Sequence, residues 1–349
     1  MNRSVRSVLL TPVLVSALSA GCMSKPSSVT EPDPPFVFRS LDLSQRREDG
    51  SRDWELSSPE ARYDLNSRTV EAEGPAGLIF RSNEPYLRVS AERVTVVNDG
   101  QRIVLEGNVR LQQLQDPHRV IEGGRLVWTP DDTVMVVDQK PKVREGQSEL
   151  QAERFVLTQG RDLLTLTGPT RVLLPDSTIS GGSGAWNLQT GHLTVEGPLT
   201  GLRADQSVLT ASGLKGNTTA EVLDLMHPVT LRWSKNRGSV VADTTRWLYS
   251  RGTFHSDGPM QGSRQGLRME GIGFVIDERL STLKVSSACR LEQPGEQLEA
   301  ERCLWNWRSN EIVAERHGSR LEGRVRSEFH LAPGGVNPGV EASTSPVRF

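Results

Sequence analysis

The chain has 349 residues, of which 36% are hydrophobic, 24% charged and 5% aromatic, and its formal net charge is −2. Its 41 Lys and Arg residues nearly balance its 43 Asp and Glu residues, so no basic field is available to recruit nucleic acid. Apolar residues recur along the chain, which argues against disorder over most of its length. The presence of only three cysteines excludes a disulfide-dense small scaffold and a four-cysteine zinc module.

The first predicted element is an export signal over residues 1–21. Arg3 and Arg6 precede an apolar run that is too short to span a membrane, since a span takes about 20 residues. The run ends in LSAGC, which resembles the lipobox of bacterial lipoproteins, and the thiol of Cys22 would then carry an acyl anchor. An ordinary signal peptide cut near Ala20 and an uncleaved weak anchor are the alternatives. All three place the mature chain outside the cytoplasm.

Two terminal segments flank the folded region. Residues 22–35 are rich in Ser and Pro and predict a lipidated N-terminus followed by a flexible tether. Residues 332–349 predict a second disordered tail. The folded domain is therefore expected over residues 36–331.

A repeat of about 30 residues organises this domain. A small residue recurs at nine anchor positions: Ser58, Ala91, Gly123, Ala152, Gly181, Ala211, Ala242, Gly271 and Ala300. The residues two places before and twelve places after the anchor are apolar in every unit, and five places after it Gly216 is the one exception. Within a unit, apolar and polar residues alternate, which is the period of a strand. The alternation changes parity at the anchor, so a bulge or corner is expected there.

These patterns predict an all-β fold. We expect an elongated stacked β-jelly roll or solenoid of about nine repeats with an apolar interior groove. A transmembrane barrel would need aromatic girdles and an apolar outer face, whereas the outward positions of this chain carry charged residues. A propeller would need units of about 40 residues or more.

Several phrases in the first two units carry a family resemblance. They are DWEL at 53–56, EARYD at 60–64, VEAEG at 70–74, VSAERV at 89–94 and IVLEGNVRL at 103–111. They resemble the LptC/OstA-type (LptA-like) repeat of lipopolysaccharide export proteins. The resemblance is strongest over residues 36–115 and persists more weakly to about 330.

The resemblance implies a V-shaped β-jelly roll in the periplasm whose apolar interior holds the acyl chains of lipid A. The implied partners are the subunits of an inner-membrane ABC transporter and other OstA-like bridge proteins, joined by strand addition. The chain departs from the family's inner-membrane member, which has a transmembrane helix and a shorter jelly roll. It therefore either does the work of more than one bridge module or has an altered role.

The candidate lipid-groove residues are those that face inward in the repeat frame. They are Tyr63, Val96, Ile103, Trp128, Met135, Leu157, Leu164, Trp186, Leu193, Leu223, Trp247, Phe254, Ile276, Leu283 and Trp305. Each alone has a simpler explanation as a large side chain in a β core. Together they would form a long apolar trough if the two sheets splay apart, and the resemblance is what favours the splayed form.

Two cysteines remain in the folded domain. Cys289 and Cys303 occupy positions where other units have apolar partners, and in an oxidising compartment they are expected to form a disulfide. Two buried free thiols are the alternative. The histidines have no metal-ligand spacing and the chain has no phosphate-binding loop, so we expect no metal, no cofactor and no enzymatic activity.

The sequence thus predicts a periplasmic lipoprotein anchored in the inner membrane. It would hold lipid acyl chains in its groove and pass them from the transporter toward the outer membrane. The segment 37–43 lacks Pro and Gly, so its strand edge is expected to dock to the transporter. The alternatives are a β-solenoid lipoprotein that binds glycan or peptide, a structural envelope scaffold, and a solenoid enzyme.

Overall fold

The computed structural model describes residues 36–234, 238–309, 311–317 and 324–330. The predicted signal peptide, Cys22, the tether and the C-terminal tail lie outside the described residues. Most of the described chain is strand, and its helical elements are two single turns, η1 (Asn98–Gly100) and η2 (Gln159–Arg161). The described part contains no helix that is long and apolar enough to cross a membrane. The predicted all-β class is confirmed.

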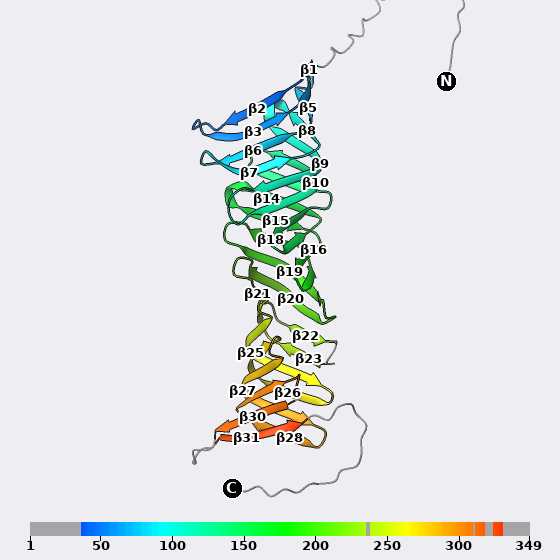
Figure 1. Cartoon of the computed structure of the whole chain (residues 1–349), viewed down its shortest axis with the longest axis vertical. Helices are drawn as coiled ribbons and strands as arrows, with labels where there is room; N and C mark the ends of the chain where they lie inside the picture. Colours follow the sequence, from blue (N-terminus) through cyan, green and yellow to red (C-terminus); the bar gives the residue numbers. More distant parts are fainter. Residues whose placement is uncertain (1–35, 235–237, 310, 318–323, 331–349) are drawn as a thin grey trace, which may run out of the picture. The chain divides into compact units, whose positions relative to one another are not determined.

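The strands form one continuous antiparallel sheet that folds into two walls, and they are stacked in chain order (Figure 1). We define the walls by their hydrogen-bonded pairings. Wall 1 alone contains β1 (Phe36–Phe38), β4 (Glu60–Asp64), β5 (Thr69–Glu73), β8 (Arg93–Val97), β11 (Val134–Asp138), β14 (Arg154–Thr158), β15 (Leu163–Thr167), β18 (Gly184–Asn187), β21 (Val222–Leu225), β24 (Thr245–Leu248), β29 (Arg302–Asn306), β30 (Glu311–His317) and β31 (Arg324–His330).

Wall 2 faces wall 1 across the interior. Wall 2 alone contains β2 (Leu41–Arg46), β3 (Arg52–Ser58), β6 (Ala76–Arg81), β7 (Glu84–Ser90), β12 (Lys142–Glu145), β13 (Ser148–Gln151), β16 (Thr170–Leu174), β17 (Ser177–Gly181), β22 (Val229–Trp233), β23 (Gly238–Ala242) and β28 (Glu296–Ala300). Long strands continue from one wall into the other: β9 (Arg102–Gln113), β10 (Arg119–Thr129), β19 (His192–Arg203), β20 (Val208–Asn217), β25 (Thr253–Arg264), β26 (Leu267–Asp277) and β27 (Thr282–Gln293).

The corner between the walls lies at the anchor positions. The register between β9 and β10 shifts between Gly123 and Arg125, and that between β26 and β27 shifts between Glu270 and Ile272. A Cβ on Gly123 would lie 2.9 Å from the carbonyl oxygen of Asp138, so the close approach of the backbone requires glycine there. The expected bulge is therefore present at these anchors. The number of repeats stays a prediction, because some units consist of short separate strands and others of long continuous ones.

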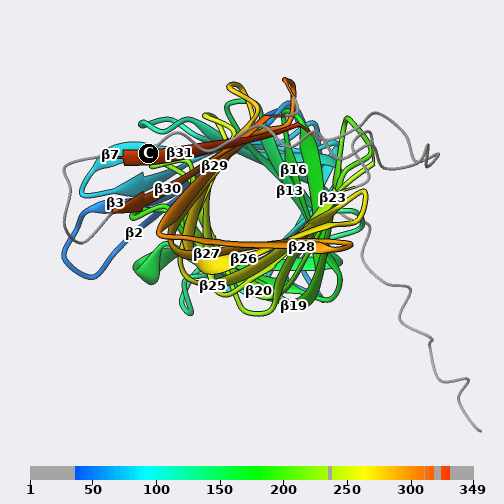
Figure 2. The ribbon, with the colours of Figure 1, turned by 90° about the horizontal axis from the view of Figure 1, so that it is seen from below.

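Alternation along each strand divides its side chains between the interior and the solvent. In β19, Leu193 and Val195 are buried while His192 and Thr194 are exposed. The strands surround the interior in the view along the stack (Figure 2), and a single cluster of buried apolar side chains extends through it from β3 to β30.

At the N-terminal end of the stack, two strand edges have no partner among the residues that the structure describes. The segment 37–43 is divided between β1 on wall 1 and β2 on wall 2, with a bend at residues 39–40. Among the described strands, β1 pairs with β4 alone and β2 with β3 alone. Phe36 and Val37 are 54% and 62% exposed. Within the described part of the chain, each wall therefore has an unpaired strand edge at this end.

Candidate functional site

The candidate groove residues all lie in one row on wall 1. Members of the row oppose one another directly in neighbouring strands, as Trp186 in β18 opposes Leu193 in β19. We call this row the inward row; it consists of Tyr63, Val70, Val96, Ile103, Trp128, Met135, Leu157, Leu164, Trp186, Leu193, Gly216, Leu223, Trp247, Phe254, Ile276, Leu283, Trp305 and Ile312. The two inward positions of each repeat meet because a tight turn brings them opposite each other.

Over most of its length the inward row is packed. Its candidate residues are buried, except Tyr63 and Trp305, which are half-buried. Trp128 makes an edge-on contact with Trp54 of wall 2, with ring centroids 5.7 Å apart. The two walls therefore meet across much of the interior, and space for a ligand is confined to cavities.

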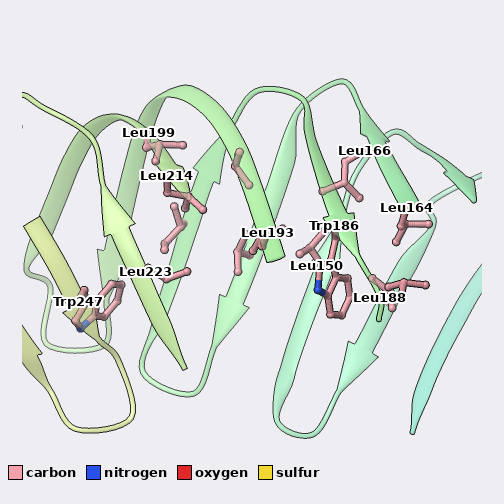
Figure 3. Close-up of a cluster of buried hydrophobic side chains, with 14 of the residues drawn as sticks. Leu150, Leu164, Leu166, Trp186, Leu188, Leu193, Leu199, Leu214, Leu223 and Trp247 are labelled. Carbon is pink, nitrogen blue, oxygen red and sulfur yellow. The ribbon is translucent and has the colours of Figure 1, made fainter. Parts of the chain in front are cut away.

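A cavity of about 810 Å³ opens over the middle of the inward row. This volume lies within the range of about 300–1,000 Å³ that is usual for small-molecule sites. Its apolar lining includes Leu150, Val172, Trp186, Leu193, Leu223 and Trp247, most of which are drawn in Figure 3. We call it the central cavity.

The inward row lacks a side chain at one position, which lies between two residues that line the central cavity. Gly216 stands between Leu193 and Leu223 in the row, at the position where other units have tryptophan or another large residue. A Cβ on Gly216 would lie 2.5 Å from Cδ2 of Leu223 and 2.6 Å from the carbonyl oxygen of Val222. The exception in the repeat pattern therefore reflects the close packing of β20 against β21, which leaves no room for a side chain at Gly216.

Charged side chains connect the two walls at the strand ends that lie away from the corner. We call this side of the interior the mouth. Arg203 at the end of β19 on wall 2 forms an ion pair with Glu278, in the turn that follows β26 on wall 1. Both side chains are largely buried, with 18% and 16% of their surface exposed, and both line the central cavity. Burial raises the pKa of Glu278, and the neighbouring Arg203 opposes that shift.

A second connection lies toward the N-terminal end. Nη2 of Arg81 on β6 is 2.6 Å from Oδ1 of Asp162, in the wall 1 turn before β15. The hydroxyl of Tyr86 donates a hydrogen bond of 2.9 Å to the same carboxylate. Burial raises the pKa of Tyr86 to about 12, so this phenol keeps its proton at neutral pH and remains a donor.

Arg119 forms a third connection and is 2% exposed. It pairs with Glu145 of β12, donates to the carbonyl oxygen of Leu188 on wall 1, and lies over the ring of Trp186, with its guanidinium carbon 4.9 Å from the centroid. Arg119 is thus a charged residue at an inward position. Arg119 shares the inward parity of Ile121, two places later, and that parity was the signal available in the sequence.

The structure joins Cys289 and Cys303 by a disulfide, with their Cα atoms 6.0 Å apart. Cys289 lies in the part of β27 that pairs with β28 on wall 2, and Cys303 lies in β29 on wall 1. Both residues are buried. The bond therefore connects the two walls inside the C-terminal end of the stack.

The described part of the chain offers no group of His, Cys, Asp and Glu side chains that could hold a metal ion. The arrangement consists of an apolar row, a cavity on it and charged connections across its mouth. It is suited to enclosing an elongated apolar ligand.

Comparison with known families gives one match. Residues 7–177 match the family model described as lipopolysaccharide-assembly, LptC-related. The match covers the N-terminal half of the chain, from the predicted signal to β17. No curated protein matches the chain.

Proposed function

We propose that this chain, which belongs to the LptC-related family of lipopolysaccharide-assembly proteins, is a periplasmic component of the lipopolysaccharide export bridge. In this role it receives lipopolysaccharide from an inner-membrane ABC transporter and passes it toward the outer membrane. The acyl chains of lipid A lie between the walls, and the headgroup stays at the mouth.

The observation that supports this proposal is the continuity of the inward row. A transported acyl chain needs an apolar surface at every step, because each exposed methylene costs about 0.8 kcal/mol in water. The inward row supplies apolar side chains from Tyr63 in β4 to Ile312 in β30, and Gly216 is its one gap.

The packing of the interior adds a requirement to the proposal. Wall-to-wall contacts such as Trp54–Trp128 occupy the space that an acyl chain would take. Loading therefore requires the walls to separate and the connection between Arg203 and Glu278 to open. A structural scaffold with a permanent core would show the same packing. A structural envelope scaffold is therefore the second candidate function.

Strand edges and a lipid anchor complete the proposal. The free edges of β1 and β2 provide backbone groups to which a strand of the transporter could pair. An acylated Cys22 would hold this end of the chain at the inner membrane.

Site-specific photocrosslinking in the cell envelope tests the function. A photoreactive residue at Leu193 or Trp247, both buried in the inward row, should capture lipopolysaccharide when the transporter is active. The matched control is Thr194, which is exposed on the opposite face of β19. Capture at Leu193 and not at Thr194 supports conveyance. If no inward position captures lipopolysaccharide while the transporter is active, the result would contradict conveyance and favour the structural scaffold.

A further inference from the structure

The two walls are tied together beside the corner at the C-terminal end of the stack. The disulfide joins Cys289 on wall 2 to Cys303 on wall 1, and Cys289 is paired with the anchor residue Ala300. At the same two positions of an earlier repeat, Val109 and Leu126 are buried apolar residues without a covalent link. A rotation of the walls about the corner would pull the two cysteines apart. The bond therefore fixes the angle between the walls at this level of the stack.

The same end is also closed at the mouth. Trp233, at the end of β22 on wall 2, contacts Trp307, which directly follows β29 on wall 1, and their ring centroids are 6.3 Å apart. The guanidinium carbon of Arg264, at the end of β25 on wall 2, lies 5.2 Å from the ring centroid of Trp305 on wall 1. Two aromatic contacts therefore connect the walls on the side opposite the disulfide.

The space between these ties is filled. The cavity lined by Trp233, Trp305 and Trp307 has a volume of about 20 Å³, which is room for about one water molecule. The central cavity, by contrast, has about 810 Å³, and the connection over it is the ion pair of Arg203 and Glu278. Charged groups that separate into water regain their hydration, whereas a disulfide separates only by reaction with a thiol. The central section is therefore the easier of the two to open.

We propose that the disulfide and the two aromatic contacts form a clamp, which holds the walls together from β25 onward and confines opening of the interior to the strands before it. The inward row beyond the central cavity is then a permanent core. In the export role, on which this step rests, lipid leaves the groove through the mouth at or before the central cavity. It does not travel along the last strands of the stack.

Oxidation of buried methionines by hydrogen peroxide tests the clamp without a ligand. Met260 and Met269 lie inside the C-terminal end and are each 2% exposed, and Met135 of β11 is 0% exposed. Peroxide forms methionine sulfoxide only where it reaches the sulfur. In a Cys289→Val/Cys303→Leu variant, Met260 and Met269 should oxidise at least about tenfold faster than in the unmodified chain, because the bond no longer suppresses local opening. Met135 should keep its rate.

This variant gives the C-terminal end the apolar pair that Val109 and Leu126 supply in the earlier repeat, so it removes the bond and keeps the packing apolar. Met135 is the matched control within the same chain, since a general loss of stability would speed the oxidation of all three methionines. Equal acceleration at Met135, Met260 and Met269, or acceleration at none of them, would overturn the clamp.

Photocrosslinking in the cell envelope tests the consequence for lipid. Leu193 and Leu283 both stand twelve places after an anchor and are 1% and 2% exposed. A photoreactive residue at Leu283 should capture lipopolysaccharide in the variant and not in the otherwise unmodified protein, whereas one at Leu193 should capture it in both. Capture at Leu283 in the unmodified protein would overturn the clamp. Absence of capture at Leu193 in both proteins would overturn the export function, and the methionine measurement would still decide the clamp.

Discussion

Arg203 and Glu278, which are 75 residues apart in the sequence, form an ion pair that connects wall 2 to wall 1 over the central cavity. Both are largely buried. Burial raises the pKa of Glu278, because it disfavours the charged form of the carboxyl group. Removing this ion pair should therefore lower the free energy of unfolding and make the interior more accessible at the mouth.

Arg203→Met should lower the free energy of unfolding by about 3 kcal/mol at neutral pH, because it leaves the Glu278 carboxylate buried without its cationic partner and with the hydrogen bond from Trp233. Urea unfolding measures the change. The deficit should widen as the pH rises above the pKa that Glu278 has in the unmodified protein, which lies above the ordinary value of 4.5. The reason is that the folded variant resists ionisation of a group that the unfolded chain ionises freely.

The control for this variant is Arg246→Met, because Arg246 and Asp224 form a more exposed ion pair worth at most about 1 kcal/mol. Adding Glu278→Leu to Arg203→Met should recover most of the stability. A double variant as unstable as the single one would show that the carboxylate is not the cause.

Arg119→Lys should cost about 1.5–3 kcal/mol in the free energy of unfolding. Lysine keeps the charge but lacks the planar guanidinium that reaches Glu145 and the Leu188 carbonyl together, so a charged hydrogen bond is lost. Arg110→Lys, at an ion pair whose arginine is 45% exposed, should change stability by less than about 1 kcal/mol. Similar costs at both sites would contradict the role assigned to Arg119.

The disulfide should stabilise the C-terminal end of the stack. Replacing both Cys289 and Cys303 by Ala should cost about 2–4 kcal/mol, since the bond closes a loop between residues 14 positions apart. Denaturation with and without a reducing agent gives the measurement, and the double variant should not respond to reduction. Unreduced peptide mapping of protein from the envelope should yield the linked fragment; two freely alkylated thiols would refute the pairing.

Leu41→Pro should weaken docking to the transporter. Proline removes a backbone N–H from β2, whose outer edge is unpaired among the described strands. The expected result is a loss of co-purified transporter with little change in the thermal unfolding of the isolated chain. Glu296→Pro, in β28 near the opposite end of wall 2, is the matched control and should leave the complex intact. An unchanged yield for Leu41→Pro would exclude this edge.

Cys22→Ser should abolish metabolic labelling of the protein with palmitate, because the serine hydroxyl does not replace the thiol in lipoprotein acylation. The protein should then be recovered as an uncleaved precursor or a soluble form. Cys289→Ser is a matched control that should keep the label. Persistent labelling of Cys22→Ser would refute the lipoprotein assignment.

The sequence by itself determined the local structure of this protein. Apolar and polar residues alternate along each strand, and this alternation puts Trp186, Leu193 and Trp247 on one face. The turns between strands then align these residues into the inward row, because register is a property of neighbouring strands. The parity change at anchors such as Gly123 likewise indicated the corner between the walls.

Only the tertiary structure decided how the walls meet. Alternation assigned Arg119 to a face but could not show that this face is covered by Leu188 and Trp186 from wall 1. The partnership of Arg203 with Glu278 depends on where a turn of wall 1 falls over the end of a wall 2 strand, 75 residues away. Such contacts follow from the twist and spacing of the stacked strands, which no local pattern records. They determine that the interior is packed and that a cavity opens at Trp186, Leu193 and Trp247.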